Sequence, residues 1–259
     1  MAVFTADDGV QIHYDTRGDS GPGLILSHGW CGIRNHWAPQ LEYFSKNYRV
    51  LAIDRRGYGA STPPANYQYS LEREAADAAQ IAKSLGITDA TVIGHAGGFP
   101  GALGLAAHYP DLVKRLVLEE GVPLGHTPAM DELVNGLISN ISGPGFEDAM
   151  RGIYPNFFHP EADRACVSMC AADAARTPQN VAVGYLKALH HMDAFSLAKT
   201  LKMPVLFVWG EIPLRPITVE ELRTAIPQAN LVAVPRTGHF VHLDNPAGFN
   251  AVVEQFMTS

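Results

Sequence analysis

The stretch with the clearest chemical pattern runs from Ala90 to Gly101 and reads Ala-Thr-Val-Ile-Gly-His-Ala-Gly-Gly-Phe-Pro-Gly. It opens with the β-branched run of a buried strand, and the Ala- and Leu-rich residues 102–108 behind it favour a helix. Gly94 and Gly98 allow a sharp turn between the two. A sharp turn between a strand and a helix can hold its central side chain exposed at the end of the strand. The central residue is Ala96, whose methyl group cannot act as a nucleophile.

Strands and helices alternate on both sides of this turn. We expect eight strands, at residues 3–5, 11–15, 24–27, 48–53, 91–93, 116–119, 201–208 and 231–234. This alternation predicts an α/β fold with a mostly parallel eight-stranded sheet and helices on both faces. Between the sixth and seventh strands, from 121 to 199, we expect helices but no clear strand. We interpret 121–199 as a helical cap (lid), and 1–120 with 200–259 as one core.

The amino-acid composition excludes several classes of protein. The chain has 259 residues, of which 47% are hydrophobic and 17% charged, as in globular domains. Its formal charge of −7 leaves no basic surface for nucleic acid, and no apolar run reaches the length of a membrane span. Three cysteines and the absence of a signal-peptide pattern predict a reduced, cytoplasmic protein. No cluster has metal-ligand spacing, so neither a metal nor a cofactor is expected.

Three further motifs occur in a fixed order along the chain. They are His28-Gly29-Trp30, the turn from Asp54 to Ser61 (Asp-Arg-Arg-Gly-Tyr-Gly-Ala-Ser), and Gly238-His239-Phe240 before the last helix. With the turn around Ala96, they resemble the capped branch of the α/β-hydrolase superfamily over essentially the whole chain. The resemblance implies an esterase- or lactonase-like serine hydrolase whose nucleophile position holds alanine.

The resemblance also assigns the base and the oxyanion hole. His239 occupies the position of the family's catalytic histidine, whereas His242 is expected to pack or to cap. The backbone N–H groups of Trp30 and Gly97 match those that hold the developing oxyanion in the family. No other histidine has a comparable context.

The acid is less directly indicated. The family commonly places an aspartate after the seventh strand, where this chain has Pro213. Some members carry the acid after the sixth strand instead, and there Glu119 and Glu120 stand side by side. We favour Glu120, with Glu119 pointing to the opposite face by strand alternation, and keep Glu211 as the fallback.

The ligand is expected to be a small molecule with apolar or aromatic character, because cap residues usually wall the pocket. The residues expected to contact it are His28, Gly29, Tyr154, Phe158, Tyr185 and Met192, with Phe157 and Met169 as further cap candidates. A homodimer is compatible with these expectations, and neither nucleic acid nor a membrane is expected as a partner.

Three explanations for Ala96 stay open. A natural serine replaced by alanine fits best, because Ser-Gly-Gly-x-Pro resembles a common turn of serine-type members. The second explanation is a natural aspartate nucleophile, as in dehalogenases and epoxide hydrolases. The third is a natural alanine in a ligand-binding protein. Trp30-Cys31 also resembles cofactor-free dioxygenases, in which a His/acid pair acts without an attacking serine. We predict hydrolysis of a carboxylic ester or lactone by a Ser-His-Glu triad, inactive here at position 96.

Overall fold

An eight-stranded sheet lies at the centre of the computed structural model, which describes residues 1–121, 128–189, 191–213 and 218–259. In chain order the strands are β1 (Ala2–Thr5), β2 (Gln11–Arg17), β3 (Gly23–Ser27), β4 (Arg49–Ile53), β5 (Ala90–His95), β6 (Val113–Glu119), β7 (Val205–Gly210) and β8 (Asn230–Val234). They lie in the order β1-β2-β4-β3-β5-β6-β7-β8. β2 is antiparallel to β1 and β4, and the pairs from β4 to β8 are parallel. The predicted α/β fold is confirmed.

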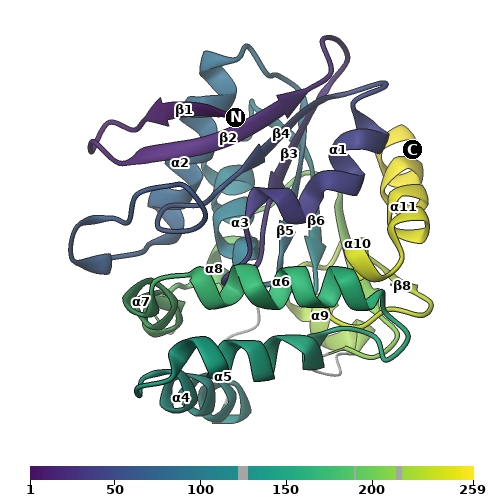
Figure 1. The fold of residues 1–259 in the computed structure, drawn as a ribbon. Coiled ribbons are helices and arrows are strands. Elements are labelled where there is room, and N and C mark those ends of the chain that lie inside the picture. The colour runs from purple at the N-terminus through teal and green to yellow at the C-terminus, as the bar shows by residue number, and fades with distance from the viewer. Residues whose placement is uncertain (122–127, 190, 214–217) are drawn as a thin grey trace.

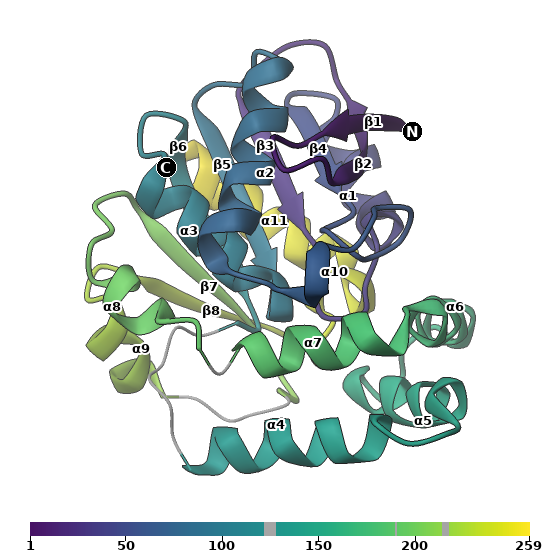
Figure 2. The same ribbon diagram turned by 90° about the vertical axis from the view of Figure 1, so that its left-hand side faces the viewer.

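Helices cover both faces of this sheet (Figures 1 and 2). One face carries α2 (Leu71–Ser84), α3 (Phe99–His108), α8 (Ala194–Ala198) and α9 (Val219–Ala225), and the other carries α1 (Ala38–Phe44), α10 (Val241–Asp244) and α11 (Pro246–Thr258). Strand alternation divides the apolar residues between the two layers. Val92 of β5 packs with α2 and α3, whereas its neighbour Ile93 packs with α1 and α11. The site at the end of β5 therefore rests on a sheet that is buried on both sides.

A third layer of helices lies beyond the carboxyl ends of the central strands (Figure 1). It consists of α4 (Pro128–Ile141), α5 (Phe146–Ile153), α6 (Arg164–Arg176) and α7 (Gln179–Leu189), with a 3-10 turn at Tyr154–Phe157. These helices share an apolar cluster with Tyr58 and Phe240 from loops of the sheet domain. We call this set of helices the cap. It falls within the segment 121–199 that the sequence marks as an insertion.

Most strands differ from the expected ranges by one to three residues, and two differences have a structural reason. α8 falls within 121–199, yet its Ala194 and Ala198 pack with α2 and α3 rather than with the cap. β7 begins at Val205 instead of residue 201, because Pro204 has no N–H to donate to a sheet ladder. Within the described ranges, we find no helix with both the length and the apolar character that crossing a membrane requires.

Candidate active site

The turn between β5 and α3 is strained at its centre. Ala96 has a φ of +43°, a left-handed conformation that costs an L-residue about 1–2 kcal/mol. The flanking glycines allow the helix to cross the strand closely. A Cβ atom on Gly94 would lie 2.7 Å from the Cβ of Ala102, and one on Gly98 would lie 2.4 Å from the carbonyl oxygen of His28. The turn is thus strained in a way that would present a reactive side chain at position 96, although the alanine there has no reactive group.

An imidazole and a carboxylate are paired beside this turn. His239 Nδ1 lies 3.0 Å from Glu120 Oε2, and the other Glu120 oxygen accepts the N–H of Gly210 at 2.7 Å. The pairing makes Nδ1 the protonated nitrogen and leaves Nε2 as the acceptor that a general base needs. Glu120 has a φ of +51°, so the chain bends sharply as it leaves β6.

The loop that carries His239 is anchored on three sides. The Asp244 carboxylate accepts the N–H groups of Gly238 at 2.7 Å and of His159 at 3.0 Å. The His239 N–H donates to the Phe157 carbonyl at 2.7 Å. This close approach requires glycine at 238, because a Cβ there would lie 2.7 Å from the same carbonyl oxygen. The imidazole is therefore held against both the sheet domain and the cap.

Behind the first pair lies a second carboxylate–imidazole pair. Glu119 Oε1 accepts the His242 backbone N–H at 2.9 Å and lies 2.8 Å from His242 Nδ1. Both side chains are fully buried, and the His242 ring stacks on Trp37 with centroids 4.0 Å apart. Burial raises the pKa of Glu119 to about 7, and the nearby charge of Glu120 pushes it the same way. Burial lowers the pKa of His242 well below its ordinary value. The second pair is thus a largely neutral support behind the first.

His95 links the two pairs. Its ring is buried, and its Nε2 donates to the carbonyl oxygen of His239 at 2.9 Å. Burial holds the pKa of His95 well below the ordinary value, so the ring is neutral. One nitrogen or oxygen from each of His95, Glu119 and His242 lies within 4.8 Å of the others, a spacing that a metal ion could bridge. Glu119 Oε1 and His242 Nδ1 bond to each other, whereas Glu119 Oε2 and His242 Nε2 have no hydrogen-bond partner among the described residues. The expectation of no metal stays a prediction.

Two backbone amides adjoin Ala96. A Cβ atom added to Gly97 would lie 2.8 Å from the Trp30 nitrogen, so the amides of these residues are neighbours. Gly97 also begins the turn into α3, where backbone N–H groups have no partner within the helix. Gly29 lies beside them, and a Cβ there would be 3.4 Å from the Ala96 methyl group. The arrangement suits an anion that forms next to position 96.

A cavity of about 160 Å³ brings these groups together between the sheet domain and the cap. Ala96, Gly97, Trp30, Glu120 and His239 all line it. Its remaining wall is apolar and mostly aromatic, formed by Phe99, Leu133, Val134, Leu137, Tyr154, Phe157, Tyr185, Leu186, Leu189, Trp209 and Phe240, with His95 and Gly121. The cavity thus has a few polar groups in a largely apolar wall, as in small-molecule sites.

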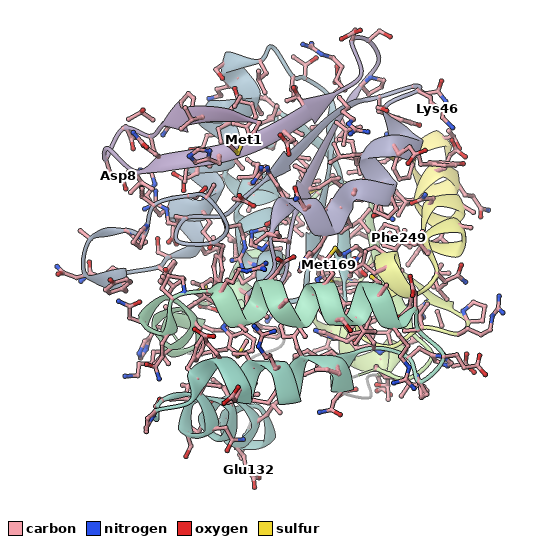
Figure 3. All side chains as sticks on the ribbon, viewed as in Figure 1. Met1, Asp8, Lys46, Glu132, Met169 and Phe249 are labelled. Carbon is pink, nitrogen blue, oxygen red and sulfur yellow. The ribbon has the colours of Figure 1, made fainter. Side chains whose placement is uncertain are left out.

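The other residues expected at the ligand lie elsewhere. Among the described residues that line the cavity, we find neither Phe158 nor Met192. Phe158 stacks on Phe240 with centroids 4.4 Å apart, inside the cap cluster. His28 is buried, with its Nε2 accepting the Arg55 N–H at 3.0 Å. Met169 is 44% exposed on α6 (Figure 3).

The fallback acid has a separate role. The Glu211 carboxylate is exposed and accepts the N–H of Arg236 at 2.6 Å. Sequence reasoning also left Phe99, Trp209 and Phe240 unassigned, although each lies within three residues of a motif at a strand end. Their positions near the ends of those strands could have identified them.

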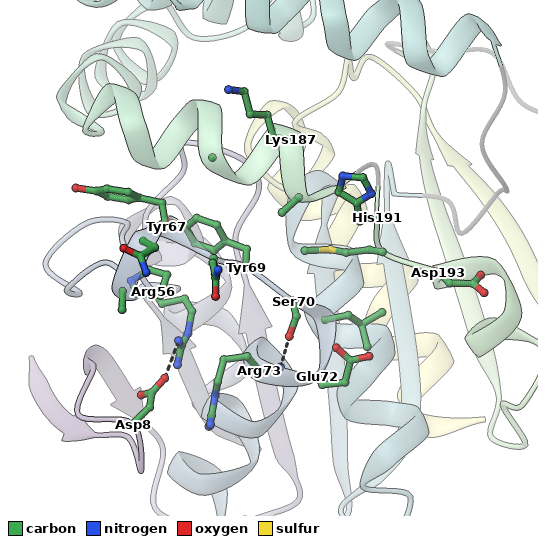
Figure 4. A pocket seen from close by; sticks show the side chains of 18 of the residues that line it. Asp8, Arg56, Tyr67, Tyr69, Ser70, Glu72, Arg73, Lys187, His191 and Asp193 are labelled. Atoms are coloured by element: carbon green, nitrogen blue, oxygen red, sulfur yellow. Dashed lines mark hydrogen bonds and ion pairs between the residues drawn. The ribbon is translucent and has the colours of Figure 1, made fainter.

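A larger, open cleft of about 1320 Å³ lies on the other side of α7. Figure 4 shows side chains from the loop before α2, from α2 itself and from α7 around it, including Tyr67, Arg73 and Lys187. Met192 lines this cleft instead of the inner cavity. Neither His239 nor Glu120 is among its described lining residues, so the base has no access to a molecule bound there.

Comparison with known proteins agrees with this architecture. The family model for the alpha/beta hydrolase family matches residues 24–252. Mouse Epoxide hydrolase 4 is 38% identical over 118 residues, which span 45% of this chain and 33% of that protein. The protein named "Putative carbamate hydrolase RutD" from Enterobacter cloacae is 27% identical over 245 residues, or 91% of each chain. The crystal structure of the enol-lactonase from Burkholderia xenovorans LB400 is similar with a TM-score of 0.89, at 24% identity and with 100% of each chain covered. This chain belongs to the alpha/beta hydrolase family.

Proposed function

We propose that the inner cavity binds a small carboxylic ester or lactone with an apolar or aromatic substituent, and that serine at position 96 makes the chain a hydrolase. The observation that carries this proposal is the Glu120–His239 pair, 3.0 Å apart, on the same cavity as Ala96 and the amides of Trp30 and Gly97. The apolar wall suits the substituent, and the polar groups suit the carbonyl.

The proposed mechanism follows the acyl-transfer chemistry of serine hydrolases. The hydroxyl of serine at 96 attacks the carbonyl carbon while His239 Nε2 takes its proton. Glu120 holds the imidazole through Nδ1 and stabilises the imidazolium. The Trp30 and Gly97 amides stabilise the oxyanion, and His239 then returns the proton to the leaving alkoxide. Water hydrolyses the acyl-enzyme by the same route. With alanine at 96, the cavity binds the substrate without forming the acyl bond.

The test is the Ala96→Ser variant, assayed beside the unchanged chain on p-nitrophenyl esters and a panel of lactones. We expect turnover from the variant and almost none from the unchanged chain, whose kcat should be lower by on the order of 10⁶-fold. Adding Glu120→Gln to the variant should lower kcat by on the order of 10⁴-fold. The control Glu211→Gln should leave it unchanged, because that carboxylate is exposed and bonded to Arg236. No turnover from the serine variant on either substrate class would refute the proposal.

The alanine itself favours a second candidate. The chain retains a base and an oxyanion site while lacking only a nucleophile, which suits proton abstraction followed by reaction of the substrate anion with oxygen. This candidate is motivated by Trp30-Cys31 after β3, which resembles the same position in cofactor-free dioxygenases. Oxygen uptake by the unchanged chain with hydroxylated heteroaromatic compounds, abolished by His239→Ala, would support it. No uptake across such a panel would remove it.

A further inference from the structure

The cap contacts both residues whose amides face Ala96. The Trp30 carbonyl oxygen accepts the Tyr154 hydroxyl at 2.7 Å, and the Trp30 indole N–H donates to the Ala182 carbonyl at 3.0 Å. The Tyr185 hydroxyl donates to the Gly97 carbonyl oxygen. Tyr154 follows α5, and Ala182 and Tyr185 belong to α7. Three hydrogen bonds thus run from separate parts of the cap to the two oxyanion residues.

The two tyrosines that donate to these carbonyls are buried, whereas Trp30 and Gly97 are partly exposed at the cavity. Tyr154 and Tyr185 are 1% and 0% exposed. Burial raises the pKa of both phenols, so each stays protonated and acts as a donor. A hydroxyl on a buried, tightly packed ring has a fixed position, so the carbonyl that accepts from it is restrained as well.

The sheet domain supports the preceding peptide, between Gly29 and Trp30. The Arg55 guanidinium donates to the Gly29 carbonyl oxygen at 3.2 Å, and that oxygen belongs to the peptide whose N–H is the Trp30 amide. The same guanidinium lies 4.7 Å from the Tyr185 ring centroid and is paired with Glu74 at 2.8 Å. The two peptides joined at the Trp30 Cα are therefore held, one by the core and the other by the cap.

We propose that Tyr154 and Tyr185 are positioning residues for the oxyanion hole, and that through them the cap sets the orientation of the Trp30 and Gly97 amides. This inference rests on the proposed hydrolase function for its kinetic consequence. Beyond walling the cavity, the cap is then needed for stabilisation of the transition state. A shift of α7 or of the turn after α5 alters kcat even when the cavity wall keeps its composition.

The kinetic test removes one hydroxyl at a time in the Ala96→Ser variant. Tyr154→Phe and Tyr185→Phe keep the rings and the apolar wall, so KM should change by less than about threefold. The kcat should fall about tenfold or more, since loss of a whole oxyanion donor costs about 10²–10³-fold. The matched control is Tyr69→Phe, a neighbouring buried tyrosine whose hydroxyl has no hydrogen-bond partner among the described residues. Its kcat should stay within about twofold of the parent.

A second measurement needs no turnover. In the unchanged chain, the amide signals of Trp30 and Gly97 are followed by NMR, with their hydrogen-exchange rates. We expect Tyr154→Phe to shift mainly the amide signal of Trp30 and to speed its hydrogen exchange. Tyr185→Phe should have the same two effects at Gly97. Tyr69→Phe should leave both signals in place. Unmoved amides, or equal kcat losses in all three variants, would overturn the positioning role. If Ala96→Ser gives no turnover, the hydrolase proposal fails, and the exchange data alone then decide whether the cap holds these amides.

Discussion

The buried carboxyl group of Glu119 should make the protein less stable as the pH rises from acid to neutral. Its side chain is fully buried against His242, and burial raises its pKa to about 7 from the ordinary 4.5. Replacing it by Glu119→Gln removes the titration but keeps an oxygen that can accept both hydrogen bonds from His242. The variant therefore isolates the proton on this one group.

The sign and size follow from the two pKa values. Below pH 4.5, the folded and unfolded chains both carry the proton. Between pH 4.5 and about 7 only the folded chain keeps it, so the free energy of unfolding falls by about 1.4 kcal/mol per pH unit. Above about pH 7 both are ionised and the loss, about 3 kcal/mol, is complete. His95 and His242 have lowered pKa values and act in the opposite direction, but they are common to parent and variant and largely cancel.

Urea unfolding followed by tryptophan fluorescence, at pH values from 5 to 8, measures this effect. The free energy of unfolding of Glu119→Gln minus that of the parent should rise by about 2–3 kcal/mol across the range. A constant offset between them is expected from the amide, which meets no partner where Glu119 Oε2 stood. The non-titrating core variant Val92→Ala should give an offset alone. Parallel curves for the glutamine variant would refute the assignment of a buried, protonated Glu119.

Three further outcomes test the fold and the cavity. Ala96→Gly should raise the free energy of unfolding by about 1 kcal/mol, because it removes the left-handed strain of an L-residue. The control Ala76→Gly, inside α2, should lower it by about 1 kcal/mol in the same urea assay. Arg56→Lys should lower it by about 3 kcal/mol, since lysine cannot replace the two-pronged contact with Asp77 at 2.7 and 2.8 Å. In the serine variant, Leu137→Ala should raise kcat/KM about tenfold for bulkier acyl chains relative to short ones. An unchanged chain-length preference would show that Leu137 does not limit the acyl site.

The meeting of the motifs could be predicted from the sequence, because the carboxyl ends of parallel strands lie at the same edge of a sheet. The motifs after β3, β5, β6 and β8 were each local in sequence, and the fold brings them together. Glu119 and Glu120 have different partners, His242 and His239, but Glu120 follows the end of β6 with a φ of +51°, so alternation along the strand does not by itself place it. The pairing of Glu119 with His242 could not be predicted, because nothing near His242 in the sequence identifies a partner 123 residues away.

The cap was harder to interpret for a geometric reason. Phe157 and Phe158 are adjacent and chemically identical, yet the first lines the cavity and the second stacks on Phe240. A change of one residue in helical phase exchanges the two, and sequence boundaries of short helices are uncertain by more than that. Tyr154 and Tyr185 were expected to contact the ligand. Their hydrogen bonds to Trp30 and Gly97 depend on tertiary contacts that no local pattern encodes.

The adjacent glutamates explain how a carboxylate reaches His239 from the end of a buried strand. Two ionised side chains side by side at a sheet edge would repel each other and lose their hydration. Glu119 lies inward, where burial and the charge of Glu120 keep it largely protonated below neutral pH. Glu120 turns towards the cavity, where the Gly210 N–H and the imidazole stabilise its charge. The inner glutamate thus supplies a neutral anchor for His242 and the loop that follows His239, and it does so without a second charge beside the base. If that is its role, Glu119→Gln in the serine variant should leave kcat near the parent value, whereas Glu120→Gln should nearly abolish it.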